Sequence, residues 1–218
     1  MTPRKADSGG KVSIAVPTGA LMPGALRLLA RAGVARLSAD ELGRQLLVDR
    51  ASVRVILVRP ADVPAYVDHG AADLGIVGKD ILWETPGEHY ELVDLKFGGC
   101  RLVLAVPLAS KLNGPETWPP QLRVATKYPR TASAWFEARG QAVEVVKLHG
   151  SVELAPQVGL VDAIVDLTAT GRTLKENRLR VTATLGASTA RLIANQASLK
   201  TRTAAVQAAV GRLWEAAG

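Results

Sequence analysis

The sequence predicts an α/β protein with largely parallel β-sheets, and three observations support this fold class. Short runs of β-branched and aliphatic residues alternate along the chain with segments of helical apolar spacing. The 218 residues correspond to one large domain or two small ones. A composition with 48% hydrophobic and 22% charged residues excludes an intrinsically disordered chain. The alternation of strands and helices implies right-handed strand–helix–strand crossovers.

The first half of the chain contains strands and helices in alternation. Residues 1–11 are polar and are expected to form a flexible tail. Val12–Val16 is expected to be a strand, and Gly19–Gly33 a helix with one apolar side. Val53–Val58 is a near-continuous apolar run, typical of a strand buried on both faces. The remaining elements expected here are a helix at Asp62–His69, a strand at Leu74–Val77, a helical turn at Lys79–Trp83, and strands at Glu91–Lys96 and Arg101–Val106.

A proline-rich segment, Leu108–Gln121, separates two blocks of this alternation and predicts two lobes. Residues 12–107 and 189–218 are expected to form lobe I, and residues 108–188 lobe II. The strands expected after the linker are Arg123–Thr126, Val143–Lys147, Ala163–Leu167 and patterns within Leu179–Asn195. The helices expected there are Thr131–Arg139, Val152–Val158, one opening near Gly171, and Ser198–Ala217 with Ser198 as its N-cap.

Net charge and composition restrict the classes of partner. A formal charge of +7 and a pI near 9.9 favour anionic partners, although a modest positive charge also serves solubility alone. Nucleic-acid binding is not favoured, because the basic residues are dispersed and only 4% of residues are aromatic. No apolar run is long enough for a membrane-spanning helix, and the polar N-terminal residues are not expected to act as a secretory signal. The single cysteine, Cys100, excludes an internal disulfide and fits a cytoplasmic protein.

The segment Asp162–Thr173 carries the strongest chemical signal. An apolar strand ends at Asp166, and a loop of hydroxyl residues and glycine leads into a helix. Backbone N–H groups and threonine hydroxyls in such a loop bind anions, and glycine lets the backbone approach a ligand closely. Carboxylates beside it accept hydrogen bonds from sugar hydroxyls. The pattern therefore favours a ligand with a ribose and a phosphate, against the alternative that a threonine only caps the helix.

These residues resemble the phosphoribosyl-pyrophosphate (PRPP) motif of phosphoribosyltransferases. The wider sequence is similar to one family in particular, the ATP phosphoribosyltransferases, over essentially residues 12–202. The blocks that carry the similarity are Lys147–Asp166, Gly171–Asn177, Arg59–Pro64, Gly70–Asp80, Phe97–Leu102 and Val124–Pro129.

The resemblance implies an enzyme that joins N1 of the adenine of ATP to the ribose C1 of PRPP, with inversion and release of pyrophosphate. This is the first step of histidine biosynthesis. Mg²⁺ is expected to accompany the substrate diphosphate, and no metal site made of protein ligands is expected. The implied fold has two lobes, like periplasmic binding proteins, with the active site in the cleft between them.

Roles for individual residues follow as expectations. Asp166 and Arg101 are assigned to catalysis, through alignment of the ribose and stabilisation of the departing pyrophosphate. The residues expected to bind PRPP are Glu153, Asp162, Asp166, Thr168, Ala169, Thr170, Gly171, Arg172 and Thr173. Those expected to bind ATP are Asp73, Leu74, Gly75, Arg101 and Lys127. Arg44, Arg59 and Lys79 are weaker candidates for anion contacts.

One departure from the family pattern concerns the end of the first strand. The family usually has Pro-Lys-Gly-Arg there, whereas this chain has Pro17-Thr18-Gly19-Ala20 and lacks both basic residues. The role of this loop is therefore open.

The resemblance also bears on assembly. The length matches the short form of the family, which lacks a C-terminal regulatory domain. Such chains bind a separate regulatory subunit that resembles histidyl-tRNA synthetase, activates the catalytic chain and confers inhibition by histidine. The implied assemblies are a homodimer alone and a hetero-octamer in the complex. The main alternative is a non-catalytic two-lobed protein that binds a phosphorylated small molecule, because fold does not determine function.

Overall fold

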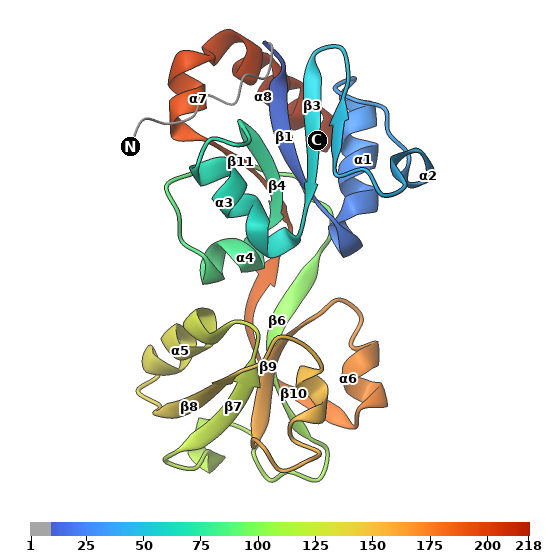
Figure 1. The fold of residues 1–218 in the computed structure, drawn as a ribbon. Helices are drawn as coiled ribbons and strands as arrows, with labels where there is room; N and C mark the ends of the chain where they lie inside the picture. The colour runs from blue at the N-terminus through green and yellow to red at the C-terminus, as the bar shows by residue number, and fades with distance from the viewer. Residues whose placement is uncertain (1–9) are drawn as a thin grey trace. The chain divides into compact units, whose positions relative to one another are not determined.

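The chain folds into two units, each with its own sheet, and the description covers residues 10–218 of a computed structural model (Figure 1). The first unit contains the residues up to Gly98 together with Thr189–Gly218, and the second is Gly99–Ser188. Residues 1–9 of the predicted tail lie outside the described residues. None of the helices found in residues 10–218 is long and apolar enough to cross a membrane.

The first unit contains a six-stranded mixed sheet. Its strand order is β2 (Leu47–Asp49), β3 (Val53–Val58), β1 (Val12–Pro17), β4 (Leu74–Gly78), β11 (Ala190–Ala194) and β5 (Tyr90–Asp94). β1 pairs in parallel with β3 and β4, whereas the pairs β2–β3, β4–β11 and β11–β5 are antiparallel. The sheet is therefore less parallel than the strand–helix alternation predicts, because β11 returns from the C-terminal part of the chain.

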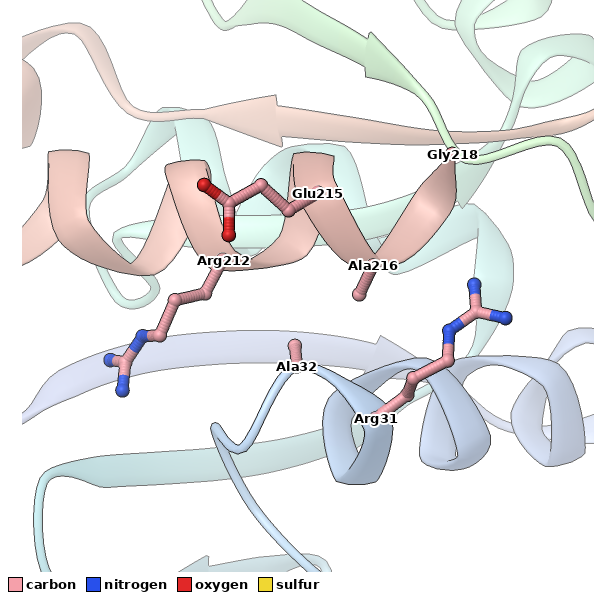
Figure 2. A pocket seen from close by; sticks show the side chains of 6 residues that line it. All are labelled: Arg31, Ala32, Arg212, Glu215, Ala216 and Gly218. Atoms are coloured by element: carbon pink, nitrogen blue, oxygen red, sulfur yellow. The ribbon is translucent and has the colours of Figure 1, made fainter.

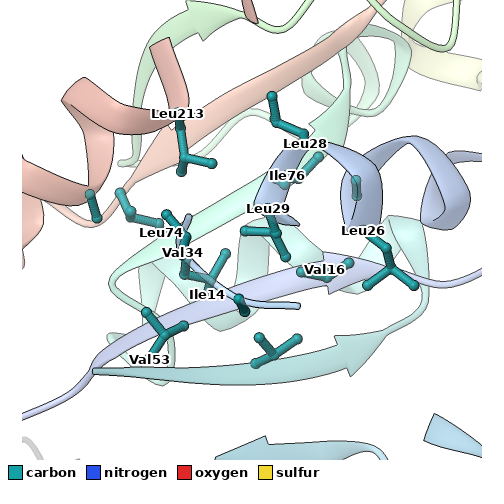
Figure 3. Packing of buried hydrophobic residues seen from close by; sticks show 14 of the residues in the cluster. Ile14, Val16, Leu26, Leu28, Leu29, Val34, Val53, Leu74, Ile76 and Leu213 are labelled. Atoms are coloured by element: carbon teal, nitrogen blue, oxygen red, sulfur yellow. The ribbon is translucent and has the colours of Figure 1, made fainter. Parts of the chain in front are cut away.

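Helices cover both faces of this sheet. The other elements of the unit are α1 (Met22–Arg31), α2 (Ala39–Leu42), α3 (Val63–Asp68), α4 (Lys79–Glu84), α7 (Gln196–Thr201) and α8 (Thr203–Ala217). Ile14, Leu29 and Leu213 belong to the core between β1, α1 and α8 (Figure 3). The next residue of β1, Ala15, lies on the other face and packs with Val63 of α3. Burial on both faces explains why β1 and β3 are almost entirely apolar.

The second unit contains a five-stranded sheet. Its order is β10 (Leu179–Ser188), β6 (Cys100–Pro107), β9 (Ala163–Thr168), β7 (Leu122–Thr126) and β8 (Val143–Lys147), with helices α5 (Pro129–Glu137) and α6 (Arg172–Glu176). β7 is parallel to β8 and β9, and β6 is antiparallel to β9 and β10. Because β6 pairs only within this sheet, the second unit begins at Gly99 and not at the predicted position, residue 108.

Two predicted helices differ from the structure. At Val152–Val158 only a 3₁₀ turn forms, over Val152–Leu154. A proline in the interior of a helix removes a backbone donor, so Pro156 explains the early end. The predicted C-terminal helix is two helices, and the N-cap of α7 is Asn195, whose side chain accepts the Ser198 N–H at 2.8 Å.

Candidate active site

The three parallel strands of the second unit end at one edge of its sheet. In open α/β sheets, ligands bind at the carboxyl ends of the strands, where neighbouring connections leave in opposite directions. From β7 the chain continues to β8 on one side of the sheet order, and from β9 it continues through α6 to β10 on the other side. The place where the connections diverge therefore lies between β7 and β9. Lys127 follows β7, and Thr168 ends β9. The sheet therefore brings the predicted PRPP loop and Lys127 to the same edge.

The loop after β9 is organised by its threonine hydroxyls. Thr168 is buried, and its Oγ1 accepts the N–H of Gly171 at 2.9 Å. Oγ1 of Thr170 accepts the N–H of Arg172 at 3.4 Å. Gly171 has φ +79°, a left-handed conformation that only glycine adopts without strain. The loop thus holds a turned backbone between β9 and α6, with Ala169, Thr170 and Thr173 exposed beside it.

Asp166 is the buried carboxylate of this edge. It lies on β9, is 8% exposed, and its Oδ1 accepts the N–H of Leu167 at 2.9 Å. Burial raises the pKa of Asp166; the Leu167 N–H and the Lys127 ammonium oppose this shift, and the neighbouring Glu153 carboxylate adds to it. Two carboxylates and one ammonium group therefore lie close to the threonine loop.

Arg101 reaches the same edge from an antiparallel strand. It lies at the start of β6, in register with Thr168. Its guanidinium is exposed and has no hydrogen bond or ion pair to any of residues 10–218. Arg172 is placed differently, because its guanidinium pairs with Glu176 at 2.7 Å on the surface of α6. Arg101 is thus the arginine available to an anion, whereas Arg172 contributes its backbone to the loop.

Asp162 does not belong to this group, although it was predicted to bind PRPP. It precedes β9, and the six residues of that strand separate it from the loop by about 20 Å. Its carboxylate accepts the backbone N–H of Arg123 and the Arg123 guanidinium, both at 3.0 Å. These bonds connect the amino ends of β7 and β9. We therefore assign Asp162 a structural role, because the strand carries it to the edge opposite the loop.

Replacing Asp162 with asparagine is expected to change acid stability and not PRPP use. The hydrogen bonds from Arg123 lower the pKa of Asp162, so its stabilising effect is present above the unfolded-state pKa of about 4 and is lost as pH falls through the folded-state value. The variant should unfold at neutral pH at a slightly lower denaturant concentration than the parent. The difference in free energy of unfolding between the two should shrink on acidification. A changed KM for PRPP would contradict this role.

The residues predicted to bind ATP in the first unit are all buried within its fold. The Asp73 carboxylate accepts Ser13 N–H and Oγ–H at 2.7 and 2.8 Å, Ser198 Oγ–H at 2.7 Å, and the Arg202 guanidinium at 2.6 Å. Leu74 is a core residue with no exposure. A Cβ on Gly75 would lie 2.8 Å from both Val63 and Val67, so this glycine lets α3 pack on β4. Asp73 also precedes β4 and lies at the amino edge of the sheet.

The carboxyl edge of the first sheet carries other polar residues. Thr18 follows β1, Arg59 follows β3, and Lys79 and Asp80 follow β4. Lys79 forms an ion pair with Glu91, and Asp80 is 7% exposed. A Cβ on Gly78 would lie 2.3 Å from Asp80 Oδ1, so this carboxylate folds back over the glycine and a side chain there would displace it. Sequence reasoning missed Asp80; its position directly after an apolar strand was the available signal.

Comparisons with known proteins place this arrangement in a family. The fold is shared with two-unit ligand-binding proteins, such as a truncated arginine-binding protein of Thermotoga maritima at 13% identity, TM-score 0.58, and coverage of 95% of this chain and 97% of that one. The HisG family model, described as ATP phosphoribosyltransferase, matches residues 59–215. An ATP phosphoribosyltransferase of Rubrobacter xylanophilus is 52% identical over 204 residues, 91% of this chain and 94% of that protein.

A solved structure agrees with the sequence comparisons. The ATP phosphoribosyl transferase (HisG:HisZ) complex from Thermotoga maritima contains a chain that superposes with a TM-score of 0.79 at 34% identity, covering 94% of this chain and 98% of that one. The family match and these relatives define the class of protein, a pentosyltransferase. This chain belongs to the ATP phosphoribosyltransferase family.

Proposed function

We propose that this protein transfers the phosphoribosyl group of PRPP to N1 of ATP, releasing pyrophosphate, and so performs the first step of histidine biosynthesis. The observation that carries the proposal is the grouping of Thr168–Thr173, Asp166, Glu153, Lys127 and Arg101 at one sheet edge in a member of this family. The alternative of a non-catalytic binding protein is not favoured, because the likeness to such proteins is one of fold alone.

The threonine loop is assigned to the 5′-phosphate of PRPP. Its backbone N–H groups and exposed hydroxyls offer the donors that a phosphate dianion needs, and Gly171 keeps the backbone open to close approach. Asp166 and Glu153 lie beside the loop and can accept hydrogen bonds from the ribose hydroxyls. The ribose would then be held from two sides, with C1 presented to the incoming base.

Catalysis needs no protein nucleophile in this scheme. The adenine N1 is itself nucleophilic, so its bond to C1 forms as the bond from C1 to the diphosphate breaks, and the electron pair leaves with pyrophosphate. The chain contributes alignment and charge. Arg101, which has no partner within the described residues, and Lys127 are the cations placed to stabilise the departing anion.

Mg²⁺ belongs to the same proposal as a companion of the substrate diphosphate, whose charge it neutralises when bound. This ion prefers oxygen ligands and usually retains several waters, so diphosphate oxygens and one or two carboxylates suffice. Glu153 and Asp166 lie near each other at this edge and supply the chemically suitable donors. No cluster of three or more candidate ligand side chains occurs within residues 10–218.

For ATP, the carboxyl edge of the first sheet replaces the predicted site at Asp73. Asp80 offers a buried carboxylate to a ribose or an adenine amino group, and Arg59 offers an exposed guanidinium to the phosphates. Thr18 and Gly19 lie on the neighbouring strand end, where the family's Lys and Arg are missing.

The assignment can be tested with the purified chain, PRPP, ATP and Mg²⁺, with and without a regulatory subunit. We expect phosphoribosyl-ATP, followed by its near-ultraviolet absorbance, and pyrophosphate in equal amount. Omitting PRPP is the control. No product in either condition would reject the enzymatic function.

A regulatory subunit is part of this proposal, since the Thermotoga maritima relative was solved as a HisG:HisZ complex. We propose that this chain forms a hetero-oligomer with such a subunit, a hetero-octamer in the complex and a homodimer alone. We also propose a cytoplasmic location, because the substrates of the proposed reaction are metabolites of that compartment.

A further inference from the structure

The first unit has a surface groove that the proposed reaction does not use. Three adjoining cavities of about 420, 400 and 270 Å³ line the end of α8, with α1 on one side and residues 94–97 on the other. Gly218 lines all three cavities, and each pair of them shares one charged residue: Arg31, Lys96 or Glu215. They therefore form one continuous depression, called here the α1–α8 groove. Figure 2 shows Arg31 and Arg212 projecting from the facing helices, with Ala32 and Ala216 between them.

Positive charge dominates this groove. Arg27, Arg31, Lys96 and Arg212 line it, and none of them is within ion-pair distance of a carboxylate among the residues that the structure describes. The acidic lining residue Asp94 is already paired with Arg191, at 3.2 Å. The Glu215 carboxylate and the main-chain carboxylate of Gly218, which lines all three cavities, oppose the four cations, so the groove keeps an excess of positive charge.

Two features indicate that these cations serve an interaction. Arg27 and Arg31 are four residues apart on α1, a like-charge spacing that destabilises a helix when no anion is bound. Lys96 has φ +56°, a left-handed conformation that is costly for a residue with a Cβ. It is supported by the bond from its N–H to Asp94 Oδ1, at 2.9 Å.

An exposed tryptophan stands at the rim of the groove. Trp214 of α8 is 64% exposed, the most exposed aromatic residue among those described, and lines the cavity next to Lys96. Tryptophan and arginine are the residues most often found at the energetic centres of protein interfaces. The cations of the groove are spread over three cavities, which favours a protein surface over a single small anion.

We infer that the α1–α8 groove is the docking surface for an acidic surface of the regulatory subunit, with Trp214 as the apolar anchor. This inference rests on the proposed function and deepens its assembly. A second copy of this chain is disfavoured as the occupant. A twofold interface places the same patch against itself, so the four cations of one copy would face the four of the other. A partner with carboxylates around an apolar recess satisfies both the charge and the indole.

The test measures binding of the separately purified regulatory subunit to the full catalytic chain. The variant is Arg27→Glu/Arg31→Glu, which reverses two groove charges and keeps the like-charge spacing on α1. Its matched control is Arg36→Glu/Arg50→Glu, which makes the same charge change at exposed positions outside the groove. We expect the groove variant to raise Kd at least about tenfold at low salt and to flatten the salt dependence, and the control to change Kd less than about threefold.

Trp214 provides a second and independent readout. The chain contains four tryptophans, so 5-fluorotryptophan labelling gives four fluorine resonances, and Trp214→Phe identifies the one from α8. We expect this resonance to shift when the regulatory subunit is added and the other three to shift less. Trp214→Ala should also weaken binding, whereas an unshifted Trp214 resonance in a formed complex would overturn the docking surface.

The remaining outcomes separate the two proposals. PRPP-dependent thermal stabilisation of the chain alone reports the active site and should be equal in parent and groove variant. If PRPP did not stabilise the parent chain, the proposed function would be rejected. Equal partner binding by parent and groove variant, or a groove variant that changes only self-association in sedimentation, would reject the groove as the site of the regulatory subunit.

Discussion

Asp166→Asn is expected to lower kcat/KM for PRPP about 100-fold or more. The amide has the size of the carboxylate and can still accept the Leu167 N–H, but it lacks the negative charge. Two charge-assisted hydrogen bonds to ribose hydroxyls contribute about 1.5–3 kcal/mol each, which corresponds to this loss when both weaken. Because the contacts are made to PRPP, the KM for ATP should change much less.

The same substitution is expected to leave the folded chain equally stable or more stable at neutral pH. Burial raises the pKa of Asp166 in the folded state. The folded chain therefore binds this proton more tightly than the unfolded chain, and stability falls as pH rises from the unfolded-state pKa through the folded-state pKa. Asparagine carries no charge and avoids this loss. A retained Tm with lost PRPP use would show that the buried carboxylate serves binding at a cost in stability.

A pH profile separates this role from a structural one. In the parent, kcat/KM for PRPP should rise with pH through the raised pKa of Asp166, because the ionised form accepts the ribose hydroxyls. That acidic limb should be absent in Asp166→Asn. Glu176→Gln, on the exposed face of α6, is the control and should keep the parent profile. An unchanged KM and an unchanged limb in Asp166→Asn would contradict the assignment.

Asp73→Asn is expected to have the opposite signature, a large loss of stability. The carboxylate accepts hydrogen bonds from Ser13, Ser198 and Arg202, which joins the start of β4 to β1 and to the C-terminal helices. An amide would point an N–H at groups that are themselves donors. It would also leave the Arg202 guanidinium, which donates to the Lys11 carbonyl as well, without its anionic partner. Breaking one side of a buried ion pair costs about 3–5 kcal/mol.

Denaturant unfolding of the parent and two variants measures this effect. Asp49→Asn is the matched control, because Asp49 pairs with Arg54 on the surface, and it should change the unfolding midpoint little. A double-mutant cycle with Arg202→Met should show coupling between the two side chains. If Asp73→Asn were as stable as the parent but had a higher KM for ATP, the result would support the ATP contact predicted from the sequence.

Apolar patterning predicted the strands and most helices of this chain because it is a local property. Val12–Val16 and Val53–Val58 are apolar on both faces, and this directly indicates strands covered on both sides. The helix predicted at Val152–Val158 was wrong, because Pro156 limits that segment to a single turn. The boundary between the two units was predicted too late in the chain, because strand pairing is not local. The pairing of β6 with β9 and β10 places residues 100–107 in the second unit.

The family and a candidate phosphate loop can both be predicted from the sequence alone, because a run such as Asp166–Thr173 carries its chemistry in consecutive residues. Only the tertiary structure decided which carboxylates can serve that chemistry. Asp162 and Asp166 are four residues apart, yet they belong to opposite edges of one sheet, and Asp73 and Asp80 differ in the same way. The physical reason is that a strand advances about 3.3 Å per residue. A few positions along it separate a buried structural contact at one edge from a ligand site at the other.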